Sequence, residues 1–137
     1  DVTDKIRTSN VSKAASDVGT IPEVRKKLVE LQQQIANKVS LVMDGRDIGT
    51  YVLPCANLKV FLTASPEERA KRRWKEMNKK GIISDYAVVL REIIQRDAND
   101  SNRSYAPLKQ AEDALLIDTT NKSIEQVVNE IEYLLKS

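Results

Sequence analysis

The chain has 137 residues, 41% hydrophobic and 31% charged, and a formal net charge of +2, which suits one folded domain and is too small to indicate nucleic-acid binding by itself. With no histidine and a single cysteine, Cys55, the sequence excludes His- or Cys-based metal sites, Ser-His triads and an internal disulfide, and we expect a cytoplasmic location. No apolar run approaches the ~20 residues that cross a bilayer, so we expect no membrane association.

The first part of the chain predicts helices followed by a buried strand. Residues 1–20 are small and polar and predict a loop with a short helix. From Pro22 onward, apolar side chains recur at helical spacing, and Thr20 is the candidate N-cap of this helix. Residues 39–43 are apolar apart from one serine and predict a buried strand. Polarity then changes within one step, in the stretch DGRDIGT that begins at Asp44.

The second part predicts two more strands and three helices. Residues 58–62 and 114–118 have the apolar pattern of buried strands. The helices are expected after a capping box at Ser65, Pro66 and Glu68, from about Asp85 to Ala98, and after Ser123 with Gln126. Strands that are apolar on both faces and alternate with helices indicate an α/β fold, with a parallel sheet flanked by helices.

The charged stretch after residues 39–43 is a candidate site, because ligands of such sheets bind outside the carboxyl ends of the strands. Asp44 alone fits an Asp-Gly turn, or it resembles the acid that organises Mg²⁺ in phosphoryl-transfer enzymes. Arg46 and Asp47 fit a surface ion pair, or a guanidinium fork for phosphate beside an acceptor for an amino group. Their adjacency shifts the interpretation toward a site.

Three arginines share one face of the helix that follows Ser65. Arg69, Arg72 and Arg73 stand at i, i+3 and i+4. Basic residues after an acidic first turn are ordinary helix design, but arginine is also the residue chosen for bidentate binding of phosphate. The pattern supports both interpretations equally.

A second charged series ends the next helix. Arg96, Asp100 and Arg103 stand at i, i+4 and i+7, the spacing of an intrahelical salt-bridge ladder. The residues between them, Asn99, Ser101 and Asn102, are poor helix formers. A clamp for a ligand explains both the charges and this expected irregularity.

Four stretches together resemble bacterial cytidylate (CMP) kinases. They are DGRDIGT, LTASPEERAKRRWKE, REIIQRDANDSNRSYAPLKQAEDALLIDTTNKSIEQVV and ASDVGTIPEVR, and the resemblance covers essentially the whole chain in matching order and spacing. It implies a nucleoside-monophosphate-kinase fold of the P-loop type. It also implies transfer of the γ-phosphoryl group of ATP, with Mg²⁺, to CMP or dCMP in pyrimidine nucleotide metabolism.

The same resemblance implies a role for each candidate residue. Arg25 and Asp47 would bind cytosine, Ser16, Arg96 and Asp100 the sugar, and Arg46 and Arg103 the acceptor phosphate. Arg69, Arg72 and Arg73 would belong to a mobile lid at about 66–103 and neutralise charge on the transferring phosphoryl group. Asp44 would reach magnesium through water, so no direct metal ligand is implied.

One part of the family pattern is missing from this sequence. The family has a glycine-rich loop, GxxxxGK[ST], and no glycine of this chain lies in that context. We therefore expect a fragment without an N-terminal phosphate loop, inactive alone, in which residues 1–20 end the monophosphate-binding insert and 21–137 form the core. The missing strand is expected between those at 39–43 and 58–62, so that exposed strand edges favour self-association, whereas the parent protein is expected to be monomeric.

Two other functions compete with this interpretation. An adenylate- or uridylate-type kinase would share the lid, but the acid at position 47 favours cytosine, because a carboxylate accepts a hydrogen bond from the 4-amino group and would repel the O4 of uracil. A non-catalytic RNA-binding module is disfavoured by the near-neutral charge and the few aromatic residues. The expected partners are CMP or dCMP and ATP, and no nucleic acid.

Overall fold

The computed structural model describes residues 2, 6, 9–102 and 106–136. The chain divides into two compact units, Asp1–Met43 and Asp44–Ser137, which we describe one at a time. Among the helices described, none is both long and apolar enough to cross a membrane.

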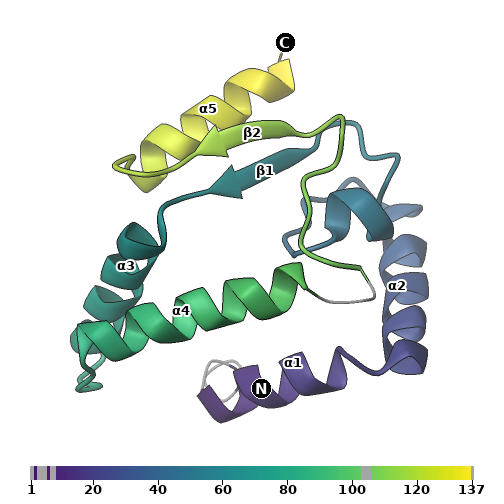
Figure 1. Cartoon of the computed structure of the whole chain (residues 1–137). Helices are drawn as coiled ribbons and strands as arrows, with labels where there is room; N and C mark the ends of the chain where they lie inside the picture. Colours follow the sequence, from purple (N-terminus) through teal and green to yellow (C-terminus); the bar gives the residue numbers. More distant parts are fainter. Residues whose placement is uncertain (1, 3–5, 7–8, 103–105, 137) are drawn as a thin grey trace. The chain divides into compact units, whose positions relative to one another are not determined.

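The first unit contains helices α1, Ser9–Val18, and α2, Pro22–Ala36 (Figure 1). Pro22 begins α2 as expected, because its fixed φ and missing N–H suit the first helical turn. The predicted N-cap is wrong. Ile21 occupies that position and makes no side-chain cap, whereas the Thr20 hydroxyl donates to the carbonyl oxygen of Asp17 at 2.6 Å.

The strand predicted at residues 39–43 is also wrong. This segment belongs to no helix or strand, and Val42 is 98% exposed. A strand exists only when a neighbour pairs with its backbone, and in the described part of the chain only β1 and β2 form a sheet. The apolar pattern is therefore present without the partner that would turn it into a strand.

The second unit is built around a small parallel sheet. Its described elements are the π-helix η2, Ile48–Val52; β1, Val60–Thr63; α3, Pro66–Lys79; α4, Tyr86–Ser101; β2, Leu115–Asp118; and α5, Ile124–Lys136. Strands β1 and β2 pair in parallel, with Val60 opposite Leu115 and Thr63 opposite Asp118 (Figure 1). The predicted parallel α/β arrangement is confirmed for this pair of strands.

The start of α3 confirms half of the predicted capping box. The Ser65 hydroxyl oxygen accepts from the Glu68 N–H at 3.2 Å. The second half, a hydrogen bond from the Ser65 N–H to the Glu68 carboxylate, does not form. The Glu68 carboxylate accepts instead from Arg72 at 3.0 Å, while the Ser65 N–H donates to the hydroxyl of Thr120 at 3.1 Å. The start of α3 is thus fastened to the loop after β2.

The start of α5 and the end of α4 also test the predictions. At the start of α5 both halves of the capping box form, between Ser123 and Gln126, at 3.2 and 2.8 Å. Helix α4 ends later than predicted, at Ser101, and Asn102 is its C-cap. The irregularity expected from Asn99, Ser101 and Asn102 is therefore wrong for Asn99 and Ser101, because the helix continues through both residues.

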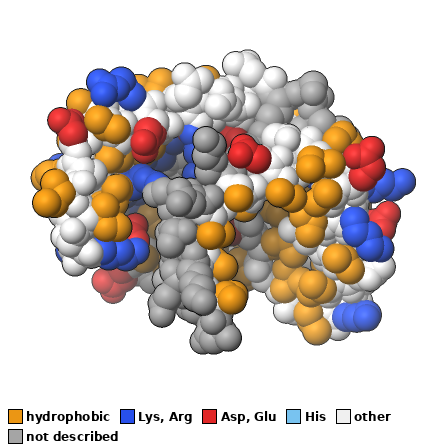
Figure 2. Space-filling view, turned by 90° about the horizontal axis from the view of Figure 1, so that it is seen from below, with side chains coloured by type: hydrophobic (Ala, Val, Ile, Leu, Met, Phe, Trp, Pro, Cys, Tyr) orange, Lys and Arg blue, Asp and Glu red, His pale blue; other side chains and the backbone are white. Residues whose placement is uncertain are grey.

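The core of the second unit is small. Its buried apolar side chains, among the residues described, are Val52, Ala64, Ala70, Val89 and Ile117. Many larger apolar side chains stay at the surface, drawn in orange on the face in Figure 2. The buried set lies on η2, α3, α4, β2 and the residue after β1, and two of these elements, α3 and α4, also carry charged residues of the candidate site.

Candidate functional site

A buried carboxylate brings two of the candidate arginines together. The Asp100 side chain is 2% exposed, and its Oδ2 accepts from the Nε of Arg46 at 2.9 Å and lies 3.9 Å from the Nε of Arg96. The two arginine side chains are 44% and 50% exposed. One protected carboxylate thus orients two accessible cations, an arrangement suited to an anionic ligand.

Local backbone geometry places Arg46 and its neighbours. A Cβ added to Gly45 would lie 2.8 Å from Cγ1 of Ile48, so this turn leaves no room for a side chain at that position. Asp47 is 5% exposed, and its carbonyl oxygen accepts from the N–H groups of Tyr51 and Val52, which begins η2. The adjacent Asp44 is exposed to solvent.

Arg69 joins α3 to α4. Its two terminal nitrogens donate to the two carboxylate oxygens of Asp97, at 2.8 and 2.7 Å, and its Nε donates to the carbonyl oxygen of Ala64 at 3.0 Å. The hydrogen bonding of Arg69 to the carboxylate of Asp97 is the main cause that raises the pKa of Arg69 above its ordinary value. Every nitrogen of this guanidinium group therefore has a partner within the protein.

Arg72 and Arg73 differ in their surroundings. The Arg72 guanidinium group donates to Glu68 on its own helix, to both oxygen atoms of Thr119, the residue after β2, and more weakly to the Lys122 carbonyl oxygen. Arg73 is exposed and has no ion pair with any described residue. On this face of α3, two arginines fasten the helix and one points its charge into solvent.

The other predicted site residues cannot be placed with this cluster. Arg25 is half-buried on α2 in the first unit, whose position relative to the second is not described. The Ser16 side chain and the whole of Arg103 lie outside the described residues. The structure thus brings together Arg46, Arg96 and Asp100.

Two polar residues near these arginines were not predicted from the sequence. Asp97 holds Arg69, and Thr119 is 7% exposed and donates to the Thr63 carbonyl oxygen at 3.0 Å while accepting from Arg72. Asp97 stands three residues before Asp100, so the helical spacing of the two acids was a usable signal. Thr119 carries no such signal, because its importance comes from contacts between distant segments.

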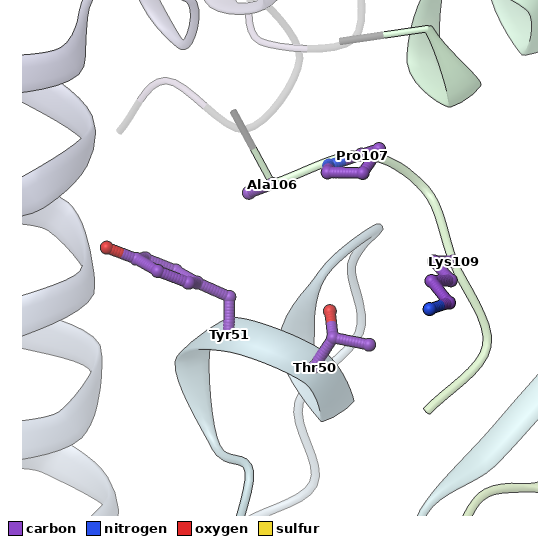
Figure 3. A pocket seen from close by; sticks show the side chains of 5 residues that line it. All are labelled: Thr50, Tyr51, Ala106, Pro107 and Lys109. Atoms are coloured by element: carbon purple, nitrogen blue, oxygen red, sulfur yellow. The ribbon is translucent and has the colours of Figure 1, made fainter. Parts of the chain in front are cut away.

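A shallow pocket of about 260 Å³ lies beside η2 (Figure 3). Thr50 and Tyr51 line it from η2, and Ala106, Pro107 and Lys109 line it from the segment that leads to β2. Ala106 has a φ of 49°, in the left-handed region where residues with a Cβ are uncommon. Among the described residues, no group of three or more His, Cys, Asp or Glu side chains is arranged to hold a metal ion.

Comparison with known proteins adds independent information. A family model described as cytidylate kinase matches residues 1–137. The chain is 58% identical over 131 residues to a cytidylate kinase of Caldicellulosiruptor saccharolyticus, 56% to one of Caldicellulosiruptor bescii and 54% to one of Streptococcus pneumoniae. In each case 96% of this chain is covered, but only 58% or 59% of the relative. The chain therefore spans less than two thirds of these curated relatives.

Proposed function

Because the chain belongs to the cytidylate kinase family, we propose that it carries the acceptor side of an enzyme that transfers phosphate from ATP to CMP or dCMP. The observation that supports this most directly is the cluster of Arg46, Arg96 and Asp100, in which a buried acid presents two accessible guanidinium groups. Phosphoryl transfer asks a protein for positioning and positive charge, and this cluster supplies both without a nucleophile.

Each part of the acceptor nucleotide is assigned to its own group of candidate residues. We assign its phosphate to Arg46 and Arg103, because a guanidinium fork matches phosphate oxygens. We assign the sugar to Ser16, Arg96 and Asp100. We assign the cytosine ring to Arg25 and Asp47, because a carboxylate accepts from the 4-amino group. The low exposure of Asp47 fits a group that meets a base in an enclosed place.

The donor side of the proposal rests on α3. Of Arg69, Arg72 and Arg73, the last is best placed to meet the transferring phosphoryl group, because its charge has no ion-pair partner among the described residues. Magnesium would enter as part of the ATP substrate, and the exposed carboxylate of Asp44 is a suitable acceptor for one of its water molecules. A cytoplasmic setting and a monomeric whole protein complete the proposal.

A chimaera tests this function. The chain replaces the matching 131-residue segment of the Caldicellulosiruptor saccharolyticus cytidylate kinase, and ADP release is measured with CMP, dCMP, UMP, AMP and GMP. We expect the largest kcat/KM for CMP or dCMP. The 137-residue chain is assayed alongside, and we expect it to form no CDP, because its sequence contains no GxxxxGK[ST] loop.

Two results would count against the proposal. Faster phosphorylation of AMP or GMP than of CMP by the chimaera would indicate another monophosphate kinase. If an Arg46→Gln chimaera has an unchanged KM for CMP, the acceptor phosphate does not bind at this cluster.

A further inference from the structure

The pair formed by Arg69 and Asp97 has the geometry of a rigid link. Two parallel hydrogen bonds of 2.8 and 2.7 Å join the planar guanidinium group to both carboxylate oxygens. Such bidentate pairs fix orientation as well as distance. Both side chains are about one-third exposed, so the pair contributes mainly geometry and little free energy.

One end of this link is anchored to the sheet. The Nε of Arg69 donates to the carbonyl oxygen of Ala64 at 3.0 Å. Ala64 follows β1 directly and is 8% exposed, so its backbone is held by the surrounding core. Arg69 therefore connects the carboxyl end of β1 to the side of α4 that carries Asp97.

The other end of the link is one helical turn from the candidate site. Asp97 and Asp100 are three residues apart on α4, and such residues are neighbours on a helix surface. Asp97 holds Arg69, and Asp100 holds Arg46. The carbonyl oxygen of Asp100 also accepts from the N–H of Leu108 at 2.9 Å, so this turn connects two separate loops.

We infer that Asp97 is a positioning residue, which through Arg69 fixes the last turns of α4 so that Asp100 holds Arg46 ready for the acceptor phosphate. The inference rests on the proposed function for the role of Arg46. In this inference Arg69 acts through its hydrogen bonds to Asp97 and to the Ala64 carbonyl oxygen. Direct binding of the transferring phosphoryl group would instead require Arg69 to leave two charge-assisted hydrogen bonds.

The test combines enzyme kinetics and hydrogen exchange. In the chimaera, Asp97→Asn is expected to raise the KM for CMP about two- to fivefold, the effect of losing a partly exposed ion pair, and to leave kcat and the KM for ATP within about twofold. In an Arg46→Gln background the same substitution should raise the KM for CMP by a smaller factor, because the part of its effect that acts through Arg46 is already lost. Asp97→Glu keeps the carboxylate and should restore most of the affinity.

Hydrogen exchange in the 137-residue chain makes the test independent of activity. Asp97→Asn should speed exchange at the amides of Asn102 and Leu108, which bond to the end of α4, and should leave α5 unchanged. Glu76→Gln, which breaks an exposed ion pair with Lys80 on α3, is the matched control and should change neither region.

The outcomes separate the inference from the function on which it rests. If the chimaera does not phosphorylate CMP, the proposed function fails, while faster exchange at the end of α4 would still support the link. If Asp97→Asn leaves both the KM for CMP and this exchange unchanged, the inference is wrong. A fall in kcat with an unchanged KM in both backgrounds would also overturn it, because Asp97 would then act on the donor side.

Discussion

Asp100 is the side chain on which the candidate site depends most. It is a carboxylate with 2% exposure, and a buried charge is tolerated only where cations or hydrogen-bond donors compensate it. Arg46 and Arg96 provide that compensation from two segments that are far apart in the sequence. Removing the charge therefore affects stability and the orientation of both guanidinium groups.

We predict that Asp100→Asn lowers the free energy of unfolding by about 1–3 kcal/mol, because a charge-assisted hydrogen bond is lost and the amide group must replace it at a buried position. Urea unfolding followed by the fluorescence of Trp74, the chain's single tryptophan, measures this loss. Asp44→Asn is the control, since that side chain is exposed to solvent. A loss no larger than that of the control would mean that Asp100 is not the buried hub described here.

The spacing of charges identified candidate site residues, and it left their arrangement in space open. The i, i+4 spacing of Arg96 and Asp100 is read directly from the sequence, and the structure keeps that pair on one helix. The contact from Arg46 to Asp100 joins residues 54 positions apart, which no local pattern contains. For the same reason the partners of Arg72 at Thr119 were not foreseen.

Helices were predicted more reliably than strands because their signals are local. Serine and proline at the start of α3, and the serine cap of α5, act within one turn of the chain. Helix α4 extends beyond Ala98 because its last turn carries Asp100, whose ion pair with Arg46 offsets the poor helix propensity of Asn99 and Ser101. Strand formation at residues 39–43 needed a partner, and sequence patterns do not supply one.

The end of α3 offers a local test of this argument. The N–H groups of Gly81 and Ile82 donate to the carbonyl oxygens of Asn78 and Met77, both at 3.0 Å, which is the Schellman pattern. Gly81 has a φ of +73°, and a Cβ added there would meet nothing within 4 Å. Any cost of a side chain at this position therefore comes from the backbone conformation alone.

We predict that Gly81→Ala lowers the free energy of unfolding by about 1–2 kcal/mol, the cost of a left-handed conformation for a residue with a Cβ. Gly81→Asn should cost less, because asparagine tolerates this region better. Trp74 is a suitable reporter, since its Nε1 donates to the Ser84 carbonyl oxygen at 2.9 Å, just beyond the turn. Equal losses for the two variants would show that φ is not the cause.

The second unit as a whole is held together by contacts at both ends of its short sheet. A parallel sheet was predicted from strands that are apolar on both faces, and the parallel pairing of β1 with β2 confirms it, although each strand has only four residues. Such short strands need further support. Lys59, next to β1, donates to both carboxylate oxygens of Asp113 at 2.8 and 2.6 Å, and the Thr120 N–H donates to Asp118 at 2.8 Å.

These two carboxylates give the unit a predictable response to acid. The hydrogen bond from Lys59 is the main cause that lowers the pKa of Asp113 below its ordinary value of 3.8, and hydrogen bonding to the Thr120 side chain is the main cause that lowers the pKa of Asp118. A group whose pKa is lower in the folded state binds protons more readily when unfolded. Its contribution to stability is therefore complete above the ordinary pKa and is lost as the pH falls through the lower, folded value.

We predict that the Tm difference between the wild-type chain and an Asp113→Asn, Asp118→Asn double variant is constant from about pH 7 to pH 5 and shrinks below about pH 4. Above that range both wild-type carboxylates are charged and keep their hydrogen bonds, so the variant has the lower Tm. Below it the wild-type carboxylates become protonated and the two proteins converge. Thermal melts followed by far-ultraviolet circular dichroism measure the difference, and an Asp44→Asn variant, which alters an exposed acid outside the sheet, is the control. A difference that persists unchanged to about pH 3 would show that these carboxylates are not stabilised in their charged form by folding.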